Sequence, residues 1–171
     1  VVSTASYEAR KFGIHSAMPV FQAKQKCSDL IIVPGNMKKY AANSKKIMEI
    51  LTHFSPKVEP VSIDEAYVDI KGCKRLFGSP KNIAGKIKNR IYTELSLTSS
   101  IGIAPIKFLS KIASDMNKPD GLTIIEKFQV KHFIQNLPIQ KVPGIGKSAM
   151  KQMKTLQINT LGDVKKYPIV I

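Results

Sequence analysis

The chain has 171 residues, and its 27 lysines and arginines against 12 aspartates and glutamates give a formal charge of +15. Hydrophobic residues make up 43% of it, which is enough to bury a core and excludes an intrinsically disordered chain. No stretch approaches about 18 uncharged apolar residues, so a membrane-spanning helix is excluded and no membrane partner is expected. This length predicts one compact domain, or one domain with a small appendage.

The positive charge indicates a polyanionic partner, because self-repulsion of this size lowers stability. A merely solvated basic surface is the alternative. The lysines are spread along the chain instead of gathering in a tail, which favours a basic groove or face. Cys27 and Cys73 show no metal-ligand spacing and form no disulfide framework. A reduced, cytoplasmic protein is therefore the expectation.

The two ends of the sequence predict that the chain is part of a longer protein. It begins with Val1 instead of methionine and ends on the apolar residues 169–171. No charged segment followed by an apolar run marks a secretory signal at the start. We expect both ends to have been cut from something longer.

The first half of the chain predicts two helices and two segments of β-structure. Residues 5–12 indicate a short helix that ends at Gly13, and residues 30–33 indicate a short buried strand. Apolar residues recur at helical spacing over 37–54, which predicts a long amphipathic helix. Residues 58–70 are rich in valine, isoleucine and tyrosine and are typical of β-structure.

The second half continues with a helix that Ser79 and Pro80 begin, as N-cap and first helical residue. The next predicted elements are a strand, a helix and a second strand, at 98–104, 108–116 and 122–125. This order predicts an α+β fold in which an antiparallel or mixed sheet has helices on one face. After residue 125 the sequence predicts helices alone, so we place a domain boundary there.

Asp64 and Glu65 are adjacent carboxylates in an apolar run, and burying them is costly unless a cation compensates. Mg²⁺ binds carboxylates together with phosphate oxygens, so the pair is a candidate metal site. Neighbours in a regular strand point to opposite faces. Both can reach one ion only at a strand end or a turn, which Ser62 and Ile63 could supply. A solvated turn is the alternative.

The segment 142–147 predicts a tight hairpin before a helix. It is not a phosphate loop, because Lys141 stands where that motif needs glycine and no strand precedes it. A helix–hairpin–helix fits better: Gly144 and Gly146 allow a sharp turn and leave backbone N–H groups to meet a phosphate. Lys147 adds positive charge there. A plain helical connection is the alternative.

Tyr7 and Arg10 lie at i and i+3, on one face of the first predicted helix. The forked donors of an arginine suit phosphate oxygens. Lys118, in the turn after the helix at 108–116, is a further candidate phosphate ligand. A carboxylate pair together with several phosphate donors is the set that two-metal phosphoryl transfer uses.

Eight segments of the chain resemble the Y-family translesion DNA polymerases, and the bacterial DNA polymerase IV branch most of all. They occur in the family's order and at its spacing over nearly the whole chain. These segments are residues 6–13, 16–19, 62–69, 76–78, 100–104, 107–114, 118–121 and 142–146.

The resemblance implies a right-handed polymerase in which residues 1–35 are part of the fingers, 36–125 the palm and 126–171 the thumb. It implies error-prone synthesis on primer–template DNA from deoxynucleoside triphosphates. Two Mg²⁺ ions would bring the primer 3′-hydroxyl and the nucleotide α-phosphate together.

The resemblance also implies a role for each candidate residue. Asp64 and Glu65 match the catalytic palm carboxylates, Asp64 as a Mg²⁺ ligand and Glu65 as the acidic partner near the primer hydroxyl. The residues implied to hold the triphosphate are Tyr7, Arg10, Lys118 and Thr4. The residues implied to contact the duplex backbone are Gly144, Gly146 and Lys147.

Two parts of the family pattern have no counterpart in these residues. One is the first strand, with a further metal-binding aspartate and the aromatic residue that excludes ribonucleotides. The other is the C-terminal domain, through which a sliding clamp would bind. We therefore expect the 171-residue chain alone to be nearly inactive.

Two other functions stay open at this point. A non-catalytic DNA-binding module built around the hairpin would treat Asp64 and Glu65 as a mere turn. A nucleotide cyclase could also place paired carboxylates on a palm-like sheet, but it would give the hairpin no role.

Overall fold

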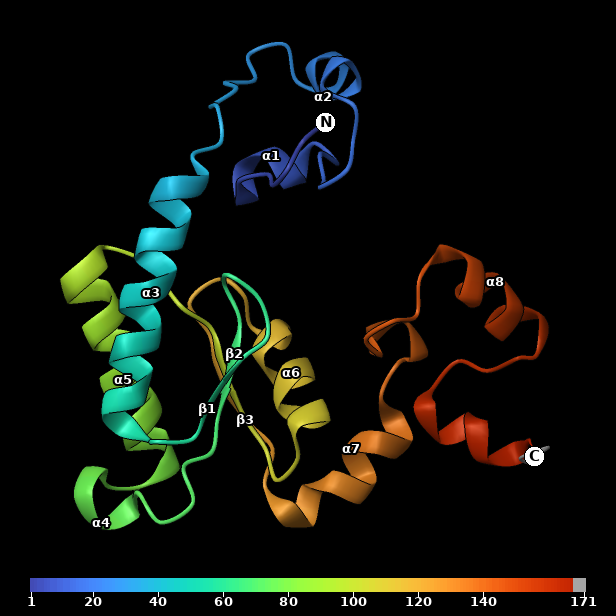
Figure 1. The fold of residues 1–171 in the computed structure, drawn as a ribbon. Helices are drawn as coiled ribbons and strands as arrows, with labels where there is room; N and C mark the ends of the chain where they lie inside the picture. The colour runs from blue at the N-terminus through green and yellow to red at the C-terminus, as the bar shows by residue number, and fades with distance from the viewer. Residues whose placement is uncertain (168–171) are drawn as a thin grey trace. The chain divides into compact units, whose positions relative to one another are not determined.

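The computed structural model describes residues 1–167, so the last four residues of the predicted thumb lie outside the described residues (Figure 1). The chain divides into two compact units, Val1–Ala42 and Asn43–Ile171. Among the described residues, no helix is long and apolar enough to cross a membrane.

The first unit contains α1 (Tyr7–Lys11), α2 (Val20–Lys26) and the start of α3 (Met37–Phe54). The helix predicted at 5–12 is confirmed. Ser6 caps α1 by accepting the N–H of Ala9 at 3.2 Å. Gly13 follows it with a φ of +74°, which glycine adopts without strain.

The buried strand predicted at 30–33 is wrong. This segment belongs to neither of the two sheets formed by residues 1–167. Ile31 and Val33 are 86% and 79% exposed, while Leu30 packs against the small core of the unit. Apolar residues form a strand only where a neighbouring strand satisfies their backbone groups and a second layer covers their side chains.

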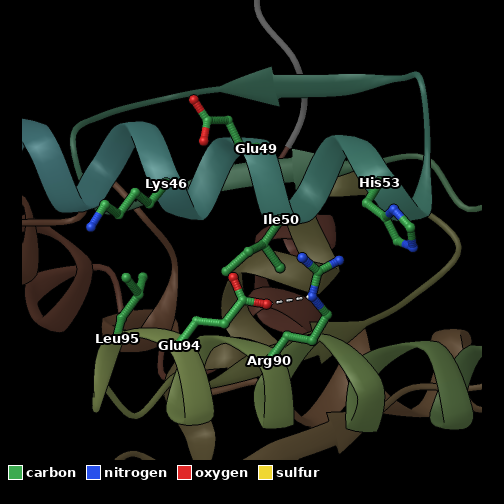
Figure 2. A pocket seen from close by; sticks show the side chains of 7 residues that line it. All are labelled: Lys46, Glu49, Ile50, His53, Arg90, Glu94 and Leu95. Carbon is green, nitrogen blue, oxygen red and sulfur yellow. Dashed lines mark hydrogen bonds and ion pairs between the residues drawn. The ribbon is translucent and has the colours of Figure 1, made fainter.

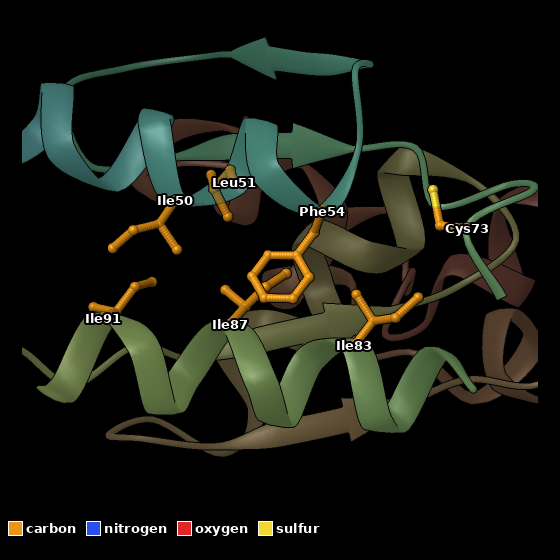
Figure 3. Packing of buried hydrophobic residues seen from close by; sticks show 7 residues of the cluster. All are labelled: Ile50, Leu51, Phe54, Cys73, Ile83, Ile87 and Ile91. Carbon is orange, nitrogen blue, oxygen red and sulfur yellow. The ribbon is translucent and has the colours of Figure 1, made fainter. Parts of the chain in front are cut away.

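The core of the second unit lies between α3 and α5 (Pro80–Leu95), as Figure 3 shows. The long helix predicted at 37–54 is confirmed, and so is the start of α5. Ser79 accepts the N–H of Asn82 at 3.2 Å and Pro80 follows it. The helical residues that meet in this core are Ile50, Leu51, Phe54, Ile83, Ile87 and Ile91.

The strands form two short pairs. β1 (Val58–Pro60) and β2 (Ala66–Val68) make an antiparallel hairpin, and the short helix α4 (Lys74–Phe77) follows it. β3 (Ile101–Ile103) and β4 (Leu122–Ile124) are parallel, and α6 (Lys107–Met116) connects them. The α+β prediction with a mixed arrangement of strands is confirmed, although each strand is shorter than predicted.

Helices cover both faces of β3 instead of one. Ile101 packs against the α3–α5 core, whereas its neighbour Gly102 faces α6, because successive residues of a strand point to opposite faces. Figure 1 shows α3 and α5 on one side of the strands and α6 on the other. Gly102 lets α6 approach this closely, since it has no side chain in the way.

The part that follows β4 is helical, as predicted. It contains η1 (Lys127–Gln129), α7 (Val130–Asn136), η2 (Ile139–Lys141), α8 (Lys147–Thr155) and η3 (Leu161–Lys166). Apolar residues of α7 pack against α6, which links this part to the strands. The division into three domains stays a prediction.

We predict that Gly102→Ala destabilises the protein by about 2 kcal/mol or more. The added Cβ would overlap the backbone of Ser110 and Ser114, so α6 would have to move. Gly85→Ala is the matched control: it is exposed on α5 with nothing within 4 Å of the added Cβ, and it should stabilise the helix by up to about 1 kcal/mol. Chemical unfolding measures both. Equal stability of the two variants would contradict this packing.

Reciprocal hydrogen bonds begin η3. Thr160 Oγ1 accepts the N–H of Asp163 at 3.3 Å, and Asp163 accepts the N–H groups of Thr160 and Asn159 at 2.9 and 3.1 Å. Lys166 Nζ donates to the same carboxylate at 2.7 Å. The bond from Lys166, followed by the two backbone bonds, holds the pKa of Asp163 well below its ordinary value of 3.8.

A carboxyl group whose pKa is lower in the folded than in the unfolded protein stabilises the fold when the pH is above its ordinary pKa. This contribution is lost as the pH falls from the ordinary pKa toward the folded-state pKa. We therefore predict that Asp163→Asn lowers the unfolding temperature at pH 7. The difference from wild type should narrow below about pH 4. Thermal unfolding followed by circular dichroism between pH 7 and about pH 3 tests this, and a pH-independent difference would refute it.

Candidate functional site

The turn between β1 and β2 carries the predicted carboxylates. The N–H groups of Val61 and Ser62 both donate to the carbonyl oxygen of Glu65, at 2.9 and 3.2 Å. These bonds close a tight turn, so Asp64 and Glu65 lie at a strand end and not within a regular strand. The two acids thus lie at a strand end, in a turn, which is the position expected from the sequence if neighbouring acids are to reach one ion.

The two carboxylates have different partners. The hydroxyl of Ser62 donates to Asp64 Oδ1 at 2.6 Å, and Asp64 is exposed. Among residues 1–167, no lysine or arginine forms an ion pair with Asp64. Glu65 is half-buried and accepts a hydrogen bond from Lys111 Nζ. The negative charge of Asp64 is thus the more available of the two for a cation.

Two lysines of α6 hold the β1–β2 hairpin. Lys107 pairs with Glu59 on β1 and lies over the ring of Tyr67, 5.6 Å from its centroid. Lys111, one helical turn further on, pairs with Glu65. Burial alone would lower the pKa of Lys111, but the hydrogen bond to Glu65 and nearby carboxylate charges outweigh it and raise that pKa. We call these two side chains the lysine clamp.

Lys118 follows the C-terminal end of α6. Its ammonium nitrogen lies 2.6 Å from Asp115 Oδ1, and Asp115 Oδ2 lies 3.7 Å from Lys111 Nζ. Ion pairs therefore run without interruption from Glu65 to Lys118. The turn of Lys118 is tied to α5 by Lys88, whose hydrogen bond is the main cause that lowers the pKa of Asp120.

The remaining triphosphate candidates lie in the first unit. The guanidinium of Arg10 is 5.4 Å from the ring centroid of Tyr7, so the predicted pairing on one helix face is confirmed. Arg10 Nε also donates to the carbonyl of Ala5 at 3.0 Å. Tyr7, Arg10 and Thr4 are all exposed.

The predicted hairpin lies between η2 and α8. Gly144 has a φ of +89°, and Gly146 is the N-cap of α8 without a side-chain capping bond. The first N–H groups of a helix have no partner within the helix. Lys147, the first residue of α8, is exposed beside them. The structure thus presents backbone donors and positive charge at one helix start.

The structure brings Asp64, Glu65 and Lys118 into one unit and connects Glu65 to Lys118. The sequence missed the residues that do this, Lys111 and Asp115. Their i, i+4 spacing was the available signal, since such residues share a helix face, and Lys118 follows them in the turn after α6.

Two hollows on the second unit lie apart from these carboxylates. One, of about 400 Å³, lies between α3 and α5, and Figure 2 shows Arg90 and Glu94 paired within it. The other, of about 300 Å³, lies beside the lysine clamp and is lined by Tyr67, Asp69 and Lys107 among others. No predicted site residue lines either hollow.

The residues present fit part of a divalent-cation site. Asp64 and Glu65 offer carboxylate oxygens in a turn, the donors that Mg²⁺ prefers. Within residues 1–167, no group of three or more histidine, cysteine or acidic side chains could hold a metal. The other ligands would have to be phosphate oxygens, water or groups outside these residues.

Family models and curated relatives match nearly the whole of this chain. Residues 1–115 match the family model described as the impB/mucB/samB family, and residues 129–158 match the IMS family HHH motif. The DNA polymerase IV of Actinobacillus pleuropneumoniae serotype 3 is 47% identical over 165 residues, covering 96% of this chain and 46% of that protein. That of Shewanella frigidimarina is 48% identical over 170 residues, covering 99% and 47%.

Solved structures of DNA polymerases also match nearly the whole of this chain. A DinB family error-prone DNA polymerase from Sulfolobus solfataricus matches with a TM-score of 0.90 and 37% identity, covering 98% of this chain and 50% of that one. An insertion ternary complex of Dbh DNA polymerase matches with a TM-score of 0.89 and 38% identity, covering 98% and 49%. The chain spans about half the length of these relatives.

Proposed function

The chain belongs to the impB/mucB/samB family of Y-family DNA polymerases, and from this we propose that its parent protein is an error-prone, DNA-templated DNA polymerase of the DNA polymerase IV branch. It would act in translesion synthesis. The observation that supports the proposal best is the carboxylate turn of Asp64 and Glu65, which the lysine clamp fixes and ion pairs connect to Lys118.

In this proposal residues 1–35 serve as fingers, 36–125 as palm and 126–171 as thumb. The substrates are primer–template DNA and deoxynucleoside triphosphates, which is consistent with the likeness to an insertion ternary complex of Dbh DNA polymerase. A cytoplasmic location, and a sliding clamp as partner of the parent protein, belong to the same proposal.

Asp64 and Glu65 would hold Mg²⁺, which when bound lowers the barrier to attack of a hydroxyl on a phosphate by neutralising charge. The chain's own side chains prepare this site. Ser62 orients the carboxylate of Asp64, and Lys111 keeps that of Glu65 against α6. Both bonds limit the directions in which the carboxylates can point.

The phosphate ligands of the proposal lie on three elements. The residues proposed to bind the triphosphate are Tyr7 and Arg10 on α1, Thr4, and Lys118. Gly144, Gly146 and Lys147 would contact the duplex backbone, because free N–H groups at a helix start favour a phosphate. The list of proposed phosphate ligands is thus Thr4, Tyr7, Arg10, Lys118, Gly144, Gly146 and Lys147.

We predict that Asp64→Asn or Glu65→Gln in the parent protein lowers the rate of nucleotide incorporation on the order of a hundredfold or more. Each substitution removes one negative charge and little volume. The control is Asp69→Asn, which removes an exposed carboxylate 3.9 Å from Lys57 on the same hairpin and should leave the rate unchanged. Single-turnover primer extension measures all three.

Each alternative function gives a different result in these assays. Wild-type turnover in Asp64→Asn or Glu65→Gln would remove the site assignment. If the affinity for DNA does not change when Mg²⁺ and nucleotide are added, and no primer is extended, the protein is a DNA-binding module. A cyclic product from labelled triphosphate would indicate a nucleotide cyclase.

We predict that neutralising Lys147 and Lys151 on α8 to glutamine lowers the salt dependence of DNA affinity. Each lost phosphate contact should reduce the slope of log affinity against log salt by roughly one. The matched control is the pair Lys45 and Lys46 on α3, likewise changed to glutamine. An unchanged slope for the α8 variant, or an equal change for both variants, would exclude the hairpin as a phosphate-binding element.

A further inference from the structure

Four charged side chains form a row of ion pairs along α6. Lys111 donates to Glu65 and also lies 3.7 Å from Asp115 Oδ2. Asp115 uses its other oxygen, Oδ1, for Lys118 at 2.6 Å. Negative and positive groups alternate in the order Glu65, Lys111, Asp115, Lys118, so Asp115 lies between two lysines and serves both.

The spacing of this row follows from the helix. Lys111 and Asp115 are four residues apart on α6, so their side chains are neighbours on one face of it. Lys118 lies in the turn after the helix, three residues beyond Asp115, and its ammonium group returns to the Asp115 carboxylate. The lysine clamp then connects the row to the β1–β2 hairpin, since Lys111 is part of the row and of the clamp.

The backbone beneath Lys118 is fixed separately. Lys88 Nζ donates to the carbonyl oxygens of Ser99 and Asp120, at 2.5 and 2.8 Å, and pairs with the Asp120 carboxylate. The N–H of Gly121 donates to Ser100 Oγ at 3.1 Å. Because these bonds hold the main chain of the turn, the direction of the Lys118 side chain is left to Asp115.

We infer that Asp115 is a positioning residue that holds the ammonium group of Lys118 ready for an incoming triphosphate. The inference rests on the proposed function, in which Lys118 binds the triphosphate and Glu65 a divalent cation. Asp115 itself touches neither. Because it shares Lys111 with Glu65, it also ties the position of Lys118 to the carboxylate turn.

A flexible lysine loses side-chain entropy when it binds phosphate, and a neighbour that already restricts it reduces that loss. Removing the charge of Asp115 should therefore weaken triphosphate binding chiefly through Lys118. Ion pairs with this degree of exposure contribute little, so the expected weakening is about threefold.

The test is a double-mutant cycle on the parent protein with primer–template DNA bound. Equilibrium titration with a deoxynucleoside triphosphate, in Ca²⁺ to suppress turnover, gives the affinity of wild type, Asp115→Asn, Lys118→Gln and the double variant. Asp115→Glu keeps the carboxylate and tests rescue. Glu94→Gln is the matched control: Glu94 is as exposed as Asp115, at 46%, and pairs with Arg90 on α5 at 2.7 Å.

We expect Asp115→Asn to weaken triphosphate binding about threefold and to add nothing in the Lys118→Gln background. DNA affinity and unfolding temperature should stay at wild-type values, and Asp115→Glu should restore most of the loss. Wild-type affinity in Asp115→Asn, the same loss in the Lys118→Gln background, or an equal loss in Glu94→Gln would overturn the inference.

Primer extension in parallel separates this inference from the proposed function. A protein that does not extend primers but shows the non-additive cycle would overturn the proposed polymerase activity and support the role of Asp115. A protein that extends primers but shows an additive cycle would support the polymerase activity and overturn the role of Asp115.

Discussion

The lysine clamp is the contact on which the candidate site depends. Lys107 and Lys111 lie one turn apart on α6 and pair with Glu59 on β1 and with Glu65 in the turn before β2. Exposed ion pairs add only about 0–1 kcal/mol each to stability. Their importance is geometric, because they fix where the turn with Asp64 lies relative to the helix.

The clamp works only because α6 itself is fixed. Leu109 and Ala113 of α6 are buried in one cluster with Ile125, the residue after β4, and Gly102 allows the helix backbone to lie directly on β3. Hydrophobic packing thus sets the position of α6, and the position of α6 sets that of the carboxylates. The same helix carries Asp115 and is followed by Lys118, so one element organises both ends of the candidate site.

The local features of this fold could be predicted from the sequence, whereas the features that depend on distant residues could not. The helices α3 and α5 follow from apolar residues at helical spacing and from the Ser79 cap, which are local signals. The segment 30–33 has the apolar composition of a strand, but a strand also needs a partner, which composition does not reveal. The pairing of Lys111 with Glu65 joins residues 46 positions apart, so no local pattern indicates it.

For the carboxylate pair too, the local feature could be predicted from the sequence and the contacts with distant residues could not. That Asp64 and Glu65 lie in a turn could be argued from their chemistry, because only a turn lets both serve one ion. That Asp64 bonds a serine while Glu65 bonds a lysine could not, since it depends on where α6 lies. The difference leaves Asp64 as the carboxylate without a cationic partner among residues 1–167.

The most direct measurement is the anomalous scattering of Mn²⁺, substituted for Mg²⁺, in crystals of the parent protein with primer–template DNA and a deoxynucleoside triphosphate. We expect a peak at inner-sphere distance from a carboxylate oxygen of Asp64 and of Glu65, from an ion that the phosphates also coordinate. A peak coordinated by the triphosphate alone, with both carboxylates turned away from it, would show that Asp64 and Glu65 are not metal ligands.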